Sequence, residues 1–134
     1  MKFSTKSTYG LRAVIRLAEH WDKGNLSLAT IANEENISLG YLEKLFSKLK
    51  KAELVKADIG VSGGYSLSKN PKDVSAFEVI KTLEGQKSIF YCLDGSGKVY
   101  CSSNCHCGGN KFLVKIQNEL IKTLQKIKLS ELTH

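Results

Sequence analysis

Cysteine is absent from this 134-residue sequence outside one short stretch, and proline, tryptophan and methionine each occur once. No apolar run approaches the roughly 20 residues that a membrane-spanning helix needs. The opening residues, MKFSTKSTYG, lack the apolar stretch of a secretory signal. We therefore expect a cytoplasmic protein with no membrane partner, and the length predicts one domain.

Motifs of familiar enzymes are also missing. The sequence has no arrangement of serine, histidine and acid for nucleophilic catalysis, and no glycine-rich phosphate loop. These absences predict that the chain is not an enzyme.

Acidic residues are outnumbered, which leaves a net charge of +7 from 20 Lys/Arg and 13 Asp/Glu. The excess is larger in residues 1–72, where 12 basic residues face 7 acidic ones. Such an excess of basic residues suits the phosphates of a nucleic acid, although a solvent-exposed helix face can have the same composition. Five lysines lie within thirteen residues, opposed only by Glu53: Lys44, Lys48, Lys50, Lys51 and Lys56.

The spacing of apolar residues predicts three helices in the first fifty residues. The first covers residues 7–21, with Ser7 or Thr5 as its cap, and ends at Gly24 and Asn25. The second begins at Ser27 and ends at Asn36, which suits a tight turn. The third begins at Ser38, and its predicted buried stripe is Leu42, Leu45, Phe46 and Leu49.

Two short strands follow the third helix, and they complete a recognisable order of elements. Residues 54–57 and 64–67 flank a loop that contains Gly60, Ser62, Gly63 and Gly64. A hairpin directly after a helix-turn-helix is a wing. The fold class we predict is mainly α: a winged helix-turn-helix DNA-binding domain, with a small β-hairpin wing and a long C-terminal dimerisation helix.

The remaining residues predict two further helices around the cysteines. VSAFEVIKTLEG carries a capping box of Ser75 and Glu78, and Phe77, Ile80 and Leu83 are expected to face inward. NKFLVKIQNELIKTLQKIKLSEL predicts one long helix that either packs back on its own domain or pairs with a second copy. We favour a homodimer on a double-stranded DNA operator, because two-fold operators mirror two-fold proteins. The dimer stripe is Leu113, Ile116, Leu120 and Leu124, continued by Ile127.

All four cysteines lie in CLDGSGKVYCSSNCHC, residues 92–107. Soft thiolates suit an iron–sulfur cluster, and glycine, serine and asparagine around them let the backbone fold about a small inorganic core. A tetrahedral zinc site, a bare thiol redox switch and a small thiol–disulfide enzyme remain alternatives. The spacing is not the paired C-x2-C of common zinc folds, and no thioredoxin pattern surrounds it.

Several segments resemble the bacterial winged-helix regulators typified by IscR, NsrR and CymR. The resemblance covers nearly the whole chain, and YLEKLFSKLKKAELV followed by GGYSL is its most specific part. It implies a homodimeric repressor with two recognition helices in successive major grooves. It also implies a DNA-binding region at residues 1–72. Residues 73–134 would then add a helix, a sensor loop and the dimerisation helix to one continuous domain.

The resemblance carries over well to DNA contacts. Ser38, Tyr41 and Glu43 match positions at the start of the recognition helix, where Glu43 can accept from a cytosine amino group and Tyr41 can contact a phosphate. Ile59 stands where the family often has an arginine that reaches the minor groove. The outward helix positions and the wing complete the expected DNA-binding set: Lys44, Ser47, Lys48, Gly60, Ser62, Gly63 and Tyr65.

For the cluster the resemblance is incomplete. Cys92 and Cys107 match the first and third family cysteines, and Cys101 is the expected middle ligand, with Cys105 as the other choice. Asn110 and Thr8 occupy the places of the usual fourth ligands, a histidine and an acid. We therefore expect Cys105 as the fourth ligand of a [2Fe–2S] cluster, with His106 as the alternative.

Overall fold

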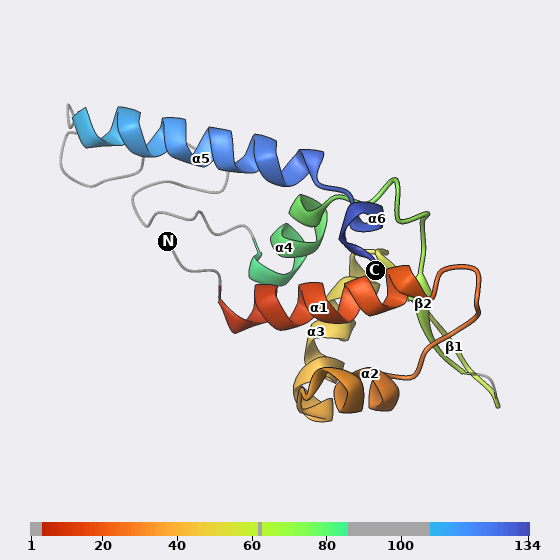
Figure 1. Cartoon of the computed structure of the whole chain (residues 1–134). Coiled ribbons are helices and arrows are strands. Elements are labelled where there is room, and N and C mark those ends of the chain that lie inside the picture. The colour runs from red at the N-terminus through yellow and green to blue at the C-terminus, as the bar shows by residue number, and fades with distance from the viewer. Residues whose placement is uncertain (1–3, 62, 86–107) are drawn as a thin grey trace.

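The computed structural model describes residues 4–61, 63–85 and 108–134. In Figure 1 a group of helices forms the body, a hairpin extends from its lower right, and a long helix crosses above it. No helix in the described part of the chain is long and apolar enough to cross a membrane. The elements in chain order are α1 (Thr5–Glu19), α2 (Leu28–Glu35), α3 (Leu39–Lys51), β1 (Val55–Asp58), β2 (Gly64–Leu67), α4 (Ala76–Glu84), α5 (Gly108–Lys126) and α6 (Leu129–Leu132).

Local capping signals place the starts of three helices where the sequence predicts them. The Ser27 and Ser38 hydroxyls accept from the backbone N–H groups of Thr30 and Tyr41, at 3.1 and 3.4 Å. The capping box of Ser75 and Glu78 is present at α4. The cap predicted for α1, Ser7 or Thr5, is wrong, because the helix begins at Thr5 and its N-cap is Ser4.

One core joins α1, α2, α3, the hairpin and α4. Side chains from the helix-turn-helix, the strands, α4 and α6 are all buried in it. Complete burial of each large aliphatic side chain contributes about 1.5–3 kcal/mol to folding. The largest fully buried members include Phe46, Ile31, Leu42, Leu49, Leu67, Leu83 and Leu129.

Helix α4 buries Leu83 as predicted, but the rest of its buried face differs from the prediction. Phe77 and Ile80 are half-buried, whereas Ala76, Val79 and Leu83 are buried. The reason is a close approach of α1, since a Cβ on Gly10 would lie 2.2 Å from Leu83 Cδ1. A helix turned to meet a glycine at this distance buries the stripe that contains Leu83.

Adding a methyl group at Gly10 is expected to destabilise the fold. Gly10→Ala places that group against Leu83, which is only 1% exposed and has little room to move. The free-energy cost of this overpacking exceeds the stability gained from the higher helix propensity of alanine. We therefore expect the free energy of unfolding to fall by about 1–2 kcal/mol. Urea titration measures it.

Gly40→Ala is the matched control for this prediction. Gly40 also lies in a helix, but no atom comes closer than 4.0 Å to its added Cβ. This control is expected to be about 0.5–1 kcal/mol more stable than the wild type. A Gly10→Ala protein as stable as Gly40→Ala would show that α1 and α4 are further apart than described.

The C-terminal residues return to the body instead of extending the long helix. Helix α5 ends at Lys126, and Lys128 then forms an antiparallel bridge with Ser75. The Leu129 N–H donates to the carbonyl of Val74 at 2.9 Å, and the Leu129 side chain is fully buried. The prediction of one helix through the sequence KLSEL is therefore wrong, and these contacts tie the base of α5 to the start of α4.

The hairpin is antiparallel, with Val55 opposite Leu67 and Asp58 opposite Gly64. Leu26 adds a third chain segment, because it exchanges two backbone hydrogen bonds with Tyr65, at 2.9 and 2.8 Å. A Cβ on Gly64 would lie 2.8 Å from the Leu26 backbone, so this close approach requires glycine. The hairpin is thus fixed at its base to the loop before α2.

Candidate nucleic-acid interface

The exposed face of α3 carries the polar residues expected to meet DNA. The side chains of Glu43, Lys44, Ser47 and Lys48 are all exposed. The opposite face buries the predicted stripe and fixes the rotation of the helix. The structure therefore brings these four side chains together on one surface, with the N-cap Ser38 at its leading end.

Tyr41 is more constrained than the other members of this set. Its ring is half-buried and meets Tyr9 of α1 edge-on, with ring centroids 6.0 Å apart. Its hydroxyl shares a hydrogen bond of 3.2 Å with Thr5. These contacts anchor the start of α3 to the first turns of α1, and they leave two hydroxyl groups side by side at the edge of the surface.

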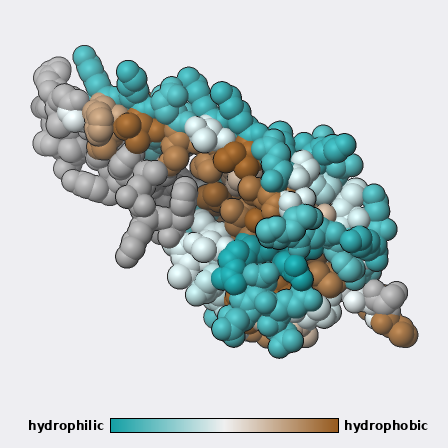
Figure 2. All heavy atoms as spheres, in the orientation of Figure 1, coloured by the Kyte–Doolittle hydropathy of each residue, from teal (hydrophilic) through white to brown (hydrophobic). Residues whose placement is uncertain are grey.

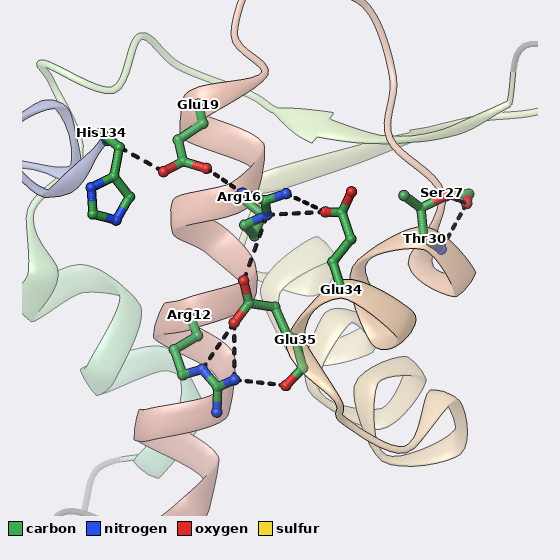
Figure 3. Close-up of polar contacts among 8 residues, drawn as sticks. All are labelled: Arg12, Arg16, Glu19, Ser27, Thr30, Glu34, Glu35 and His134. Atoms are coloured by element: carbon green, nitrogen blue, oxygen red, sulfur yellow. Dashed lines mark hydrogen bonds and ion pairs between the residues drawn. The ribbon is translucent and has the colours of Figure 1, made fainter.

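Ion pairs fix α2 against α1, a feature that the sequence analysis missed (Figure 3). Arg12 donates to the Glu35 carboxylate at 3.0 Å and to the Glu35 main-chain carbonyl at 2.6 Å, which satisfies an end carbonyl of α2. Arg16 lies between Glu34 and Glu19, and its hydrogen bond to Glu34 is the main reason that its pKa is raised. The only signal in the sequence is the pair of arginines four residues apart.

The wing is attached to the recognition helix by an aromatic contact. Tyr65 of β2 meets Phe46 of α3 edge-on, with ring centroids 5.0 Å apart. Gly60 has φ +136°, and a Cβ on Gly63 would lie 2.8 Å from the carbonyl oxygens of Asp58 and Gly60. The two glycines therefore shape the tip, and Tyr65 is half-buried at the base; Ser62 lies outside the described residues.

A carboxylate links α1 to the end of α4. The Ser4 and Ser7 hydroxyls both donate to Glu84 Oε1, the latter at 2.5 Å. Partial burial raises the pKa of Glu84, but these hydrogen bonds and the charge of Lys6 outweigh it, so the pKa lies below its usual value. The ionised form thus stabilises the fold above the unfolded-state pKa, and this contribution is lost as the pH falls through the lowered value.

The predicted dimer stripe lies on α5 with mixed exposure. Leu113, Leu120 and Leu124 are half-buried, and Ile116 is 38% exposed. Phe112, not predicted, is 63% exposed, and the most buried side chain of the helix is Gln117. Figure 2 shows apolar atoms along the side of α5 that faces the body, and hydrophilic atoms along its outer side.

Cys92, Cys101, Cys105, His106 and Cys107 all lie outside the described residues. Among residues 4–61, 63–85 and 108–134, no group of three or more His, Cys, Asp or Glu could hold a metal ion.

Residues 3–134 match the family model Rrf2, described as an iron-dependent transcriptional regulator. The chain belongs to the Rrf2 family. Its members are transcriptional regulators, which confirms the predicted resemblance, the winged-helix fold class and the prediction that the chain is not an enzyme.

Three Rrf2-type regulators illustrate the range of its relatives. IscR of Aliivibrio salmonicida is 33% identical over 132 residues, which are 98% of this chain and 77% of that protein. The structure of CymR, the global cysteine regulator of B. subtilis, has a TM-score of 0.84 at 32% identity, and the match covers 100% and 99% of the two chains. The oxidized form of Staphylococcus aureus CymR has a TM-score of 0.80 at 30% identity, and the match covers 100% of this chain and 97% of that one.

Proposed function

We propose that this Rrf2 regulator is a homodimeric repressor that places two α3 helices in successive major grooves of a two-fold operator. The observation that carries this proposal is the exposed face of α3, where a carboxylate and two lysines lie on a helix fixed by its buried stripe. The lysines suit phosphates and the carboxylate suits a base edge. The two functions are separable by substitution.

Glu43 is the proposed base reader. Its side chain is exposed within the first two turns of α3, the part of a recognition helix that contacts base edges. A carboxylate accepts from the amino group of cytosine, which is a lone donor in the major groove. We propose that three neutral side chains near Glu43 form hydrogen bonds with the DNA backbone: Ser38, Tyr41 and Ser47.

Lys48→Ala and Glu43→Ala are expected to weaken DNA binding in different ways. Loss of the lysine removes one phosphate contact in each subunit, so affinity falls similarly for all sequences and the salt slope decreases by about one per subunit. Loss of the glutamate relaxes the preference at one base pair, at a cost of about 1–3 kcal/mol at that position. Binding selections from a random duplex pool, repeated over a range of salt concentrations, measure both effects.

Lys72→Ala is the control for the lysine, because it removes one exposed charge outside α3. It is expected to leave the slope near the wild-type value. An unchanged base preference in Glu43→Ala would show that α3 does not dock with its leading end in the groove.

For the sensor, we propose a [2Fe–2S] cluster held by Cys92, Cys101, Cys107 and Cys105, with His106 as the alternative fourth ligand. Four thiols within sixteen residues form a soft donor set of the kind that iron–sulfur clusters use. The family description, an iron-dependent regulator, supports this choice. Such a cluster would supply a redox-sensitive group, while the chain's own residues would transmit its presence to α5.

A thiol redox switch without metal is the second candidate for the same segment. The observation in its favour is the similarity to CymR, which includes a structure described as an oxidized form. Cys105 and Cys107 are separated by one residue, so oxidation of their thiols would alter two neighbouring side chains of the same segment. Metal analysis distinguishes the two candidates.

A further inference from the structure

The leading turn of α3 carries an exposed apolar side chain next to a residue without one. Leu39, the first residue of the helix, has an exposed fraction of 42%, whereas the four side chains of the buried stripe are at most 2% exposed. Gly40 follows it and is also exposed. An aliphatic group and a bare stretch of backbone therefore lie together at the end of the helix that is proposed to enter the major groove.

No contact within the described residues explains the glycine at position 40. Its φ is not positive, and the atom nearest to a Cβ built there is the Ser38 hydroxyl oxygen, at 4.0 Å. At Gly10 and Gly64, by contrast, such a Cβ would lie 2.2 and 2.8 Å from another segment of the chain. Alanine would favour the helix more than glycine does, so position 40 suits a partner that approaches the backbone closely.

The pair lies on the same side of α3 as the proposed base reader. Leu39 and Gly40 precede Glu43 by four and three residues, which makes both of them its neighbours on the helix surface. The Tyr41 N–H donates to the Ser38 hydroxyl at 3.4 Å, which fixes this turn. Four residues of helix span about 6 Å, close to two base-pair steps of about 3.4 Å. The pair can therefore reach bases within about two base pairs of the cytosine assigned to Glu43.

We propose that Leu39 and Gly40 form a contact site for the methyl group of one thymine in each half-site. This proposal rests on the proposed docking of α3 in the major groove. The thymine methyl is the apolar group that base edges present in that groove. Leu39 excludes water from it, and the missing side chain of Gly40 leaves room for it over the backbone. The first turn of α3 has no charged side chain, so a phosphate matches this site less well.

The consequence is a second source of base specificity beside the carboxylate. Glu43 distinguishes cytosine by its amino group, whereas Leu39 and Gly40 distinguish thymine by its methyl group. Because the methyl contact is apolar, it changes the base preference without changing the salt slope. Substitutions at Glu43 and at the Leu39–Gly40 pair should therefore affect different base pairs.

The test uses the full-length protein and a duplex that the wild type selects from a random pool. Each symmetric pair of thymines is replaced in turn by deoxyuridine, which removes the methyl group and keeps the base pairing. One such pair, within about two base pairs of the Glu43-dependent cytosine, should lower wild-type affinity about fourfold in each half-site. For the dimer the loss is then on the order of tenfold.

Two variants of α3 should change this ratio of affinities in different ways. Leu39→Ala removes the apolar contact, so it should bind the thymine and uracil duplexes about equally. Gly40→Ala places its own methyl group where the thymine methyl lies, so it should bind the uracil duplex at least as tightly as the thymine duplex. A general loss of folded protein would lower affinity for both duplexes alike, so it cancels in the ratio.

Val61→Ala is the matched control, because it trims an exposed apolar side chain outside α3 and should keep the wild-type ratio. A wild type that is indifferent to every thymine near the cytosine would overturn the proposal. A thymine preference that survives in Leu39→Ala or in Gly40→Ala would overturn it as well. Glu43→Ala on the same duplexes reports on the docking of α3: if the cytosine preference depends on Glu43 and no methyl effect is found, the methyl contact alone fails.

Discussion

Leu120→Glu is expected to give a monomer that keeps its helical signal and loses operator binding. Leu120 is half-buried in the middle of the proposed dimer stripe of α5, where a carboxylate in an apolar contact has no partner. Each monomer then binds one half-site, and without the linked second contact the affinity falls on the order of 100-fold or more. Sedimentation, circular dichroism and operator titration measure the three expected results.

Two further variants make this result specific to the interface. Asn118→Glu introduces the same charge at an exposed position two residues away and should remain dimeric. Ile116→Glu should also give monomers, and because Ile116 is 38% exposed its replacement disturbs the subunit itself less. A wild-type protein that sediments as a monomer at micromolar concentration would refute the proposed dimer.

Serine substitutions in residues 92–107 are expected to remove most of the bound cluster at three positions and to alter it at a fourth. Cys92→Ser, Cys101→Ser and Cys107→Ser each replace a soft thiolate by a hydroxyl that binds iron poorly at neutral pH. Cys105→Ser should instead shift the visible spectrum and raise sensitivity to oxygen. Iron content and absorption of protein purified without oxygen measure these effects.

The fourth ligand is the part of this prediction most open to refutation. A single residue separates Cys105 from Cys107, so both sulfurs must turn toward one centre on a tight turn. A spectrally silent Cys105→Ser together with an altered His106→Ala would move the assignment to the histidine. If neither variant changes the spectrum, the fourth ligand lies outside this segment.

The features that the sequence predicts correctly depend on neighbouring residues. The caps at Ser27, Ser38 and Ser75 are interactions over three residues, and the buried stripe of α3 is a repeat within one helix. The left-handed Asn36 between α2 and α3 is equally local. These signals suffice to place the recognition helix and to expose its polar face.

The features that the sequence does not predict depend on distant residues. The buried face of α4 follows from Gly10, more than seventy positions before Leu83. The bridge from Leu26 to Tyr65 and the return of Leu129 to the core join segments whose composition gives no sign of pairing. Similarly, nothing in the pattern links Arg12 with Glu35, although this pair fixes α2 in the helix-turn-helix.

Contacts around α1 suggest how the two proposed parts of the regulator communicate. Ser4 and Ser7 bind Glu84 at the end of α4, eight residues before Cys92, the first of the four cysteines. Thr5 and Tyr9, on the same two turns, contact Tyr41 at the start of α3. A movement of the α4 end would therefore reach the recognition helix through α1.

Residues 92–107 are proposed to hold an iron–sulfur cluster in a DNA-binding dimer. The most direct measurement is the metal and sulfide content, with the visible spectrum, of wild-type protein purified without oxygen. We expect a coloured protein with about two iron and two sulfide per subunit, as a [2Fe–2S] cluster requires. A colourless protein that contains zinc, or four free thiols and no metal, would contradict it.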